Sequence, residues 1–183
     1  MSLHRWTDDE MRAFAAMCRR AGVEPAYALA VYSSESGLNP HAVNPGGGAQ
    51  GLAQIMPQFL RAFGWEGNPR EFHLQDVMGQ LPVIENLLKS QVRIYGGPPE
   101  SASKLYHLNL YPKTAHQNIV LTEQGDPAAY NGNKVFDPAH KGFIDEVDLA
   151  VVLGHITSSK TFEDILSQLA SVDPGPSVSG ECT

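Results

Sequence analysis

Residues 28–57 read ALAVYSSESGLNPHAVNPGGGAQGLAQIMP, and this stretch decides most of the fold. Its first part continues a run of small and apolar residues from Pro25, a residue type that suits the first turn of a helix. Gly37 predicts the end of this helix, because glycine readily adopts the left-handed conformation found after helix C-termini. Residues 39–51 contain two prolines and four glycines and therefore predict a surface loop with room for a short hairpin.

Helical patterns dominate the rest of the chain. Thr7 and Glu10 form a capping-box pattern, Trp6 and Met11 are placed as a hydrophobic staple, and this helix is expected to end near Gly22. Strand-like alternation is rare, so we predict an all-α, mainly helical fold with at most a minor β-hairpin. Further helices are predicted over 58–63, 76–95 with a break or kink before Pro82, 100–110, 115–123, 146–156 and 162–170.

The length and composition of the chain fit one domain. Its 183 residues, 42% of them hydrophobic, are enough to enclose one core. We expect a single domain over residues 1–172, followed by a disordered tail over residues 173–183. No apolar run is long enough to span a membrane. The first residues lack the apolar segment of a signal peptide, so no export by that route is expected.

The net charge argues against one class of function, and the cysteine positions argue against a disulfide. A formal charge of −7 argues against nucleic-acid binding, which needs clustered Lys and Arg. Cys18 lies in an apolar helical pattern and Cys182 in the tail, so no structural disulfide is expected between them.

Glu35 is the strongest candidate for a catalytic residue. It follows Val31 by four residues and Ala28 by seven, and therefore lies on the same helix face as these apolar groups. It also falls in the last turn, where the helix dipole opposes a carboxylate. Burial and the dipole both raise a carboxyl pKa, which keeps a general acid protonated near neutral pH. Because this placement costs stability, it favours a catalytic function.

The following loop supplies candidate ligand-binding residues. Its glycines, Gly51 among them, allow the backbone to approach a bulky ligand closely. Gln54 and Met56 add an amide and a soft apolar side chain, a combination that suits sugar hydroxyls and ring faces.

The paired motifs E-S-G-L-N-P-x-A-V and G-A-Q-G-L-A-Q-I-M-P resemble those of the lytic transglycosylase and goose-type lysozyme group of the lysozyme-like superfamily. The resemblance implies that Glu35 is the catalytic acid and that Ser36 is the substrate-binding residue after it. Gly51 and Gln54 fall on the family's G-L-M-Q motif, where Gln54 would contact the substrate. Ala53 replaces the methionine of that motif.

Residues 129–133 resemble a third family motif, A-Y-N-x-G, but lack its final glycine. The tyrosine of this motif points toward the acid, so the resemblance makes Tyr130 and Asn131 candidate substrate-binding residues. The alternative is that Tyr130 is a packing tyrosine before a turn.

Looser matches over residues 80–92, 105–106 and 111–112 resemble a phage-associated branch of these domains. The resemblance implies a phage-encoded or virion-associated enzyme that acts on the bacterial cell wall in the periplasm, with a phage virion or another delivery partner. The charge of −7 fits such delivery, since it gives a free enzyme no attraction to an anionic wall.

Residues 137–148 have the spacing of an EF-hand calcium loop. Ala139 and Lys141 occupy two ligand positions, however, which removes two oxygen ligands and adds a positive charge. We therefore predict a turn without calcium, in which Gly142 makes the bend and Ile144 packs inward. The seven histidines do not cluster at metal-ligand spacing, so no metal site or cofactor is predicted.

The resemblance implies cleavage of the β-1,4 bond between N-acetylmuramic acid and N-acetylglucosamine in the glycan strands of peptidoglycan. A hydrolase would need a second carboxylate, about 5–5.5 Å from the acid if retaining or about 6.5–9.5 Å if inverting. Glu66, Glu71 and Asp76 are available, but each also fits a surface or helix-start position. A lytic transglycosylase reuses one glutamate, and we favour it slightly. The alternatives are a muramidase or chitinase-type hydrolase, or a non-catalytic glycan-binding or virion structural domain.

Overall fold

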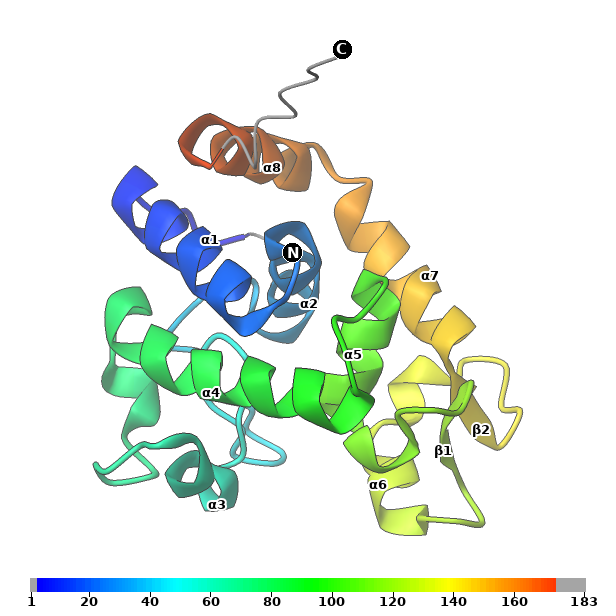
Figure 1. Ribbon diagram of the computed structural model, residues 1–183. Coiled ribbons are helices and arrows are strands. Elements are labelled where there is room, and N and C mark those ends of the chain that lie inside the picture. The colour runs from blue at the N-terminus through cyan, green and yellow to red at the C-terminus, as the bar shows by residue number, and fades with distance from the viewer. Residues whose placement is uncertain (1–2, 174–183) are drawn as a thin grey trace.

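A computed structural model describes residues 3–173, and Figure 1 shows a mainly helical fold, as predicted. The described residues form eight α-helices, four short 3-10 turns and one two-stranded antiparallel sheet. The helices are α1 (Asp8–Ala21), α2 (Pro25–Ser36), α3 (Pro57–Leu60), α4 (Val77–Tyr95), α5 (Ala102–Leu110), α6 (Pro127–Gly132), α7 (Glu146–Thr157) and α8 (Lys160–Val172), and the strands are β1 (Ile119–Thr122) and β2 (Phe143–Asp145).

Helix α2 lies at the centre of the core. Residues 28–33 are all buried in it, and α1, α5 and α7 pack around it. Phe14 of α1 meets Tyr32 edge-on, with ring centroids 6.1 Å apart. Pro25 opens the helix, and Gly37 ends it in the left-handed conformation at a φ of 65°, as predicted. Because α2 is held on several sides, its last turn has a fixed position.

The N-terminal segment is also fixed to α2. Thr7 and Glu10 form the predicted capping box at the start of α1. Trp6 and Met11 are both buried, and the Trp6 indole donates a hydrogen bond to the Leu38 carbonyl at 2.9 Å. This bond connects the entry to α1 with the exit from α2.

Helix α4 runs unbroken past Pro82, so of the predicted break or kink before this proline, the break is wrong. Asp76 caps the first turn by accepting a hydrogen bond from the Gly79 amide at 2.8 Å. Pro82 stands just after that turn, where its missing amide removes one backbone hydrogen bond near the helix end. Figure 1 shows α4 crossing below α1 and α2, and α1 packs along it.

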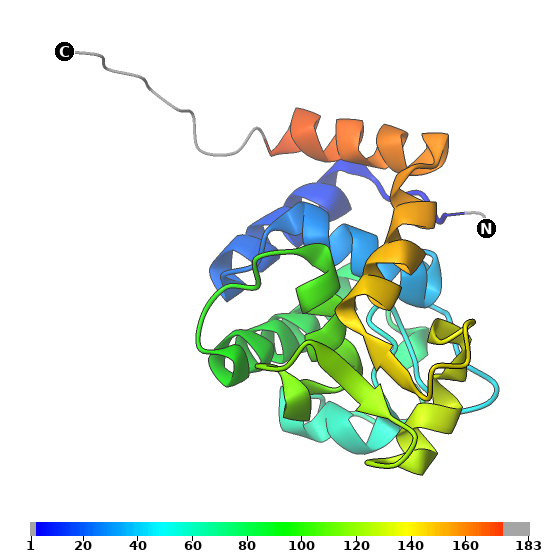
Figure 2. The ribbon, with the colours of Figure 1, turned by 90° about the vertical axis from the view of Figure 1, so that its right-hand side faces the viewer.

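The predicted helix over 115–123 is wrong, since residues 119–122 form β1. Three of these four residues are β-branched, which favours a strand. Leu121 pairs with Ile144 of β2. Helix α6, which the sequence analysis did not predict, follows β1. Figure 2 shows α7 leading from the sheet toward α8, which lies against α1.

Residues 137–148 form the predicted turn. Gly142 makes the bend at a φ of 80°, and Ile144 is fully buried. Lys141 occupies the inside of the loop, where its Nζ lies 2.7 Å from Asp148 and 3.4 Å from Asp145. The Lys141 ammonium group therefore forms ion pairs with both carboxylates.

The predicted tail lies outside the described residues except for Asp173, which forms an ion pair with Arg19 at 2.7 Å. Cys182 also lies outside them, while Cys18 is a buried free thiol. Within residues 3–173, no helix combines the length and apolar character needed to cross a membrane.

Candidate active site

Glu35 lies in the last turn of α2, half-buried among the surrounding side chains. Asn109 of α5 donates a hydrogen bond from Nδ2 to Glu35 Oε1 at 3.0 Å. Burial raises the pKa of Glu35 to about 7, although the hydrogen bond from Asn109 acts in the opposite direction. The raised pKa expected from the sequence is therefore confirmed. Such a carboxyl group can both donate and accept a proton near neutral pH.

Helix α5 provides two side chains beside Glu35. Tyr106 and Asn109 are three residues apart and therefore share one helix face. The buried Tyr106 hydroxyl lies 3.2 Å from Ser34 Oγ. Burial, together with the nearby Glu35 charge, raises the pKa of Tyr106. Sequence reasoning missed Asn109; the signal was a polar amide within the apolar run of α5.

Three further acids were candidates for a second carboxylate beside Glu35 in the sequence. Asp76 caps α4, and Glu71 accepts a hydrogen bond from Asn68 at 2.8 Å. Glu66 is exposed. These three acids thus have the surface or helix-start positions that their sequence context allowed.

Ser36 joins the two motifs that flank the loop. Its Oγ lies 2.9 Å from the Leu52 carbonyl and 3.1 Å from the Tyr32 carbonyl, so the hydroxyl proton is directed toward the backbone. This contact fixes the second motif against the end of α2. Contact of Ser36 with a substrate stays a prediction.

Gly51 is approached by a protein side chain, whereas the sequence analysis expected a ligand there. It is buried at a φ of 74°, and a Cβ atom would lie 2.4 Å from Gln80 Oε1. Gln80, which is fully buried, accepts from the Leu52 amide at 2.9 Å and donates to the Pro40 carbonyl at 2.7 Å. Gln80 therefore holds the loop on α4. Its signal in the sequence was an amide on the apolar face of the helix.

Gln54 and Met56 occupy different surroundings in the loop. Gln54 adopts a φ of 48°, and its Nε2 donates to the Gly51 carbonyl at 2.9 Å. Met56 lines a hollow of about 470 Å³, together with Arg70 and His73. A ligand in this hollow could reach Met56. Contacts of Gln54 and Met56 with a substrate remain predictions.

Tyr130 is buried and hydrogen-bonded to a residue of the following turn. Tyr130 is 1% exposed, and its hydroxyl donates to Asp137 at 2.6 Å. Asp137 also accepts from the Gly142 amide at 2.9 Å. This position fits the alternative interpretation of a packing tyrosine, which here supports the turn over residues 137–148, and contact of Tyr130 with a substrate stays a prediction. Asn131 is exposed, and its contact with substrate is untested.

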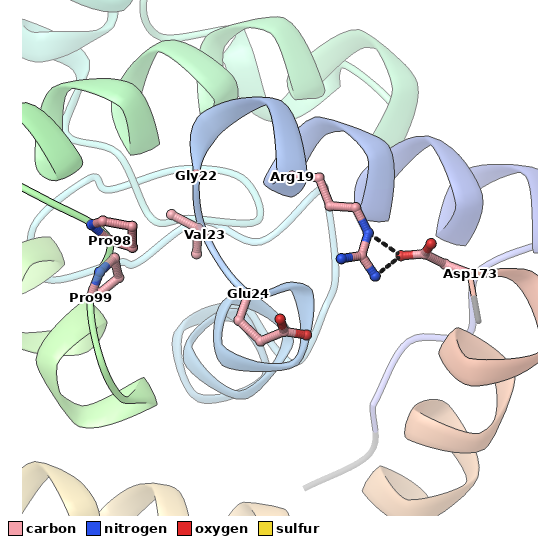
Figure 3. A pocket seen from close by; sticks show the side chains of 7 residues that line it. All are labelled: Arg19, Gly22, Val23, Glu24, Pro98, Pro99 and Asp173. Atoms are coloured by element: carbon pink, nitrogen blue, oxygen red, sulfur yellow. Dashed lines mark hydrogen bonds and ion pairs between the residues drawn. The ribbon is translucent and has the colours of Figure 1, made fainter. Parts of the chain in front are cut away.

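A larger hollow, of about 640 Å³, lies apart from Glu35. Figure 3 shows it between the turn after α1 and the loop before α5, with Glu24, Pro98 and Pro99 on its walls and the Arg19–Asp173 ion pair at one side. Its walls include none of the predicted site residues. Size alone therefore does not locate the candidate active site.

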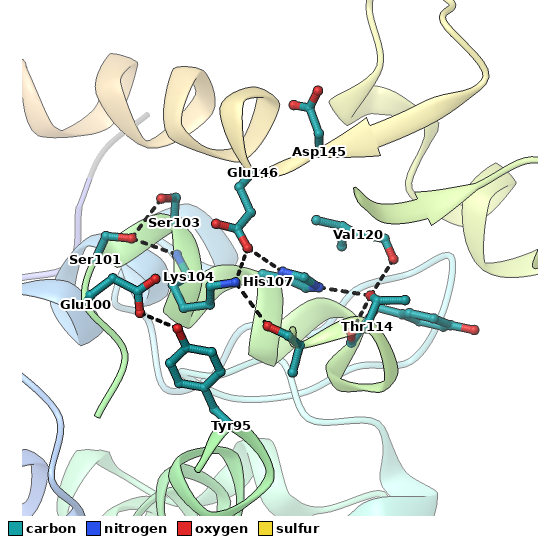
Figure 4. Close-up of polar contacts among 12 residues, drawn as sticks. Tyr95, Glu100, Ser101, Ser103, Lys104, His107, Thr114, Val120, Asp145 and Glu146 are labelled. Carbon is teal, nitrogen blue, oxygen red and sulfur yellow. Dashed lines mark hydrogen bonds and ion pairs between the residues drawn. The ribbon is translucent and has the colours of Figure 1, made fainter. Parts of the chain in front are cut away.

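A buried polar network anchors α5 to α7. Figure 4 shows Lys104 and His107 converging on Glu146, with Thr114 on the other side of the imidazole. His107 is fully buried, and burial lowers its pKa. Together these bonds hold α5, and hence Asn109, beside α2. No group of three or more His, Cys, Asp or Glu residues within positions 3–173 is arranged to hold a metal ion.

A mainly helical domain with a high-pKa glutamate at the end of its central helix, followed by a Gly-rich loop, has the features of a lysozyme-like domain. The transglycosylase SLT domain family model matches residues 12–120, more than half of the chain, and the chain therefore belongs to this family. The family indicates a lytic transglycosylase-type, peptidoglycan-cleaving enzyme. No curated protein and no solved structure matched the chain in the other two comparisons.

Proposed function

We propose that this protein cleaves the β-1,4 bond between N-acetylmuramic acid and N-acetylglucosamine as a lytic transglycosylase, with Glu35 as its single catalytic carboxyl group. The observation that carries the proposal is Glu35 itself, half-buried in the last turn of α2, with a pKa raised to about 7 and a hydrogen bond from Asn109. Membership of the SLT family supports the same reaction.

The reaction uses both protonation states of Glu35. The protonated carboxyl group donates its proton to the glycosidic oxygen, and the N-acetylglucosamine side leaves as the oxocarbenium-like state develops. The resulting carboxylate then accepts the proton of the muramic C6 hydroxyl while that oxygen bonds to C1. The product carries a 1,6-anhydro end, no water is consumed, and Glu35 regains its proton.

Digestion of purified sacculi tests whether Glu35 is needed for cleavage. The protein is expected to release soluble glycan fragments, and Glu35→Gln, which cannot transfer a proton, is expected to release none above background. Glu24→Gln is the matched control, because Glu24 is exposed and lies at the opposite end of α2. Equal release by the Glu35→Gln variant would contradict the proposal.

The same assay separates the rival functions. Release of products from chitin oligomers but not from sacculi would indicate a chitinase-type enzyme. Co-sedimentation with sacculi and no release of fragments would indicate a glycan-binding or structural domain. We also propose that a phage virion or another partner delivers the protein to the wall, a proposal that its charge of −7 supports.

A further inference from the structure

A chain of three polar side chains leads from the core to the Glu35 carboxyl group. Gln91 of α4 donates from Nε2 to Asn109 Oδ1 at 3.1 Å, and Asn109 of α5 donates from Nδ2 to Glu35 Oε1 at 3.0 Å. Gln91 is 3% exposed, while the other two residues are half-buried. Three helices thus contribute one member each.

Gln91 and Asn109 pair so that the donating end of the Asn109 amide faces Glu35. An asparagine amide has one accepting and one donating end, and a rotation exchanges them. In the structure Gln91 presents its Nε2 donor to Asn109 Oδ1, and this pairing leaves Nδ2 toward Glu35. A donor in this position favours the ionised carboxylate.

Stability does not explain why position 91 holds a glutamine. Gln91 Oε1 is buried and has no hydrogen-bond partner in the part of the chain that the structure describes. A buried carbonyl oxygen without a hydrogen-bond donor is destabilising, because it has lost its contact with water. A methionine of similar size would avoid this cost, but it would also remove the donor that orients Asn109.

We infer that Asn109, oriented by Gln91, is a positioning residue that reserves Glu35 Oε1 as a hydrogen-bond acceptor, so that Oε2 carries the proton delivered to the substrate. As the proton leaves, negative charge grows on Glu35 and the Asn109 bond becomes stronger. An interaction that is stronger in the transition state than in the ground state contributes to kcat and little to KM. This inference rests on the proposed function, and it names the groups that prepare the acid.

Two substitutions of Asn109 test the inference by kinetics and by carboxyl ¹³C NMR titration of Glu35. Asn109→Leu is expected to lower kcat on sacculi about ten- to hundredfold, the range for loss of a hydrogen bond to a charged group, with KM nearly unchanged. It should also raise the pKa of Glu35. Asn109→Asp keeps the shape but adds a like charge, so it should raise that pKa further than Asn109→Leu does.

Gln91→Met separates positioning from structural support. It is expected to lower kcat about two- to tenfold without lowering the melting temperature, because the unpaired amide oxygen is removed with the donor. Asn86→Leu is the control: Asn86, also on α4, donates to the Phe63 carbonyl at 3.0 Å, away from Glu35. This variant should keep the parent kcat and the parent pKa of Glu35.

A parent-like kcat and Glu35 pKa in Asn109→Leu would overturn the inference. A Gln91→Met variant that loses thermal stability while keeping full kcat would overturn the role of Gln91. If the parent releases no fragments, the proposed function fails. The NMR titration still tests whether Asn109 acts on the Glu35 carboxyl group. An upward pKa shift in Asn109→Leu then supports the positioning of Glu35, and an unchanged pKa contradicts it.

Discussion

At the scale of single residues, the Glu35 carboxyl group makes stability depend on pH. In the unfolded chain it ionises near its ordinary pKa of 4.5, whereas in the folded protein its pKa is about 7. Between these values the folded protein holds a proton that the unfolded chain has released. The contribution of Glu35 to stability is therefore fully present below the unfolded pKa and is lost as the pH rises through 7.

Replacement of Glu35 by glutamine should remove this pH dependence. The difference in unfolding free energy, Glu35→Gln minus parent, is expected to increase between pH 5 and pH 8 by on the order of 2 kcal/mol. Urea unfolding of both proteins at the two pH values measures the difference. The same difference between parent and variant at both pH values would contradict the raised pKa.

The close approach at Gly51 predicts a large cost for a single methyl group. Gly51→Ala would combine a left-handed backbone with a clash against Gln80, and we expect a loss of about 2–4 kcal/mol. Gly48 has the same φ of 74° but open space around it, so Gly48→Ala should cost only about 1–2 kcal/mol. Equal losses, measured by urea unfolding, would show that Gln80 does not restrict position 51.

The position and the raised pKa of Glu35 could be predicted from the sequence because both follow from local spacing along one helix. Asn109 and Gln80 could not be placed in the same way, since their partners lie on other segments of the chain. The same limit explains Tyr130, which matched a motif but donates its hydroxyl to Asp137 within its own turn. Contacts between segments depend on packing, which residue spacing does not report.

At the scale of elements, local signals predicted the helices with marked ends, and β1 was missed. The Thr7–Glu10 capping box and Gly37 lie within a turn of the ends that they define. Strand β1 instead needs β2, which lies far along the chain and supplies Ile144 opposite Leu121. A short apolar run without its partner fits a helix or a strand equally well.

The position of the Lys141 ammonium group leads us to expect that the loop over 137–148 folds without calcium. Its ammonium group lies between Asp145 and Asp148, where it reduces the repulsion between the two carboxylates. Lys141→Met should lower the unfolding free energy by about 0.5–1 kcal/mol, the range for partly exposed ion pairs. Thermal unfolding with calcium or with a chelator should give the same midpoint for the parent.

Lys160→Met is the control for this substitution, because Lys160 forms an ion pair with Asp164 on the exposed surface of α8. Its replacement should change stability less than Lys141→Met does. A higher melting temperature of the parent in calcium would mean that the loop binds the ion despite Lys141.

At the scale of the whole molecule, the charge of −7 predicts how activity depends on salt. An acidic protein is repelled by an anionic wall, and salt screens this repulsion. Between about 10 mM and about 150 mM salt, the Debye length falls from about 30 Å to about 8 Å. The initial rate of fragment release from sacculi should therefore rise over this range.

A charge-reversal variant isolates the electrostatic effect. The double variant Glu24→Lys, Glu163→Lys replaces a negative charge with a positive one at each of two exposed positions. The net charge therefore changes from −7 to −3. This variant should show a weaker rise with salt than the parent. A rate that falls with salt in the parent would contradict the predicted repulsion.

The most direct test of the central claim, that Glu35 alone cleaves the glycan strand, is mass spectrometry of the fragments released from sacculi. The parent is expected to release 1,6-anhydro-muropeptides, each one water lighter than the corresponding hydrolysis product, and Glu35→Gln is expected to release none. Reducing-end muropeptides from the parent would contradict the claim, because hydrolysis by this route requires a second carboxylate.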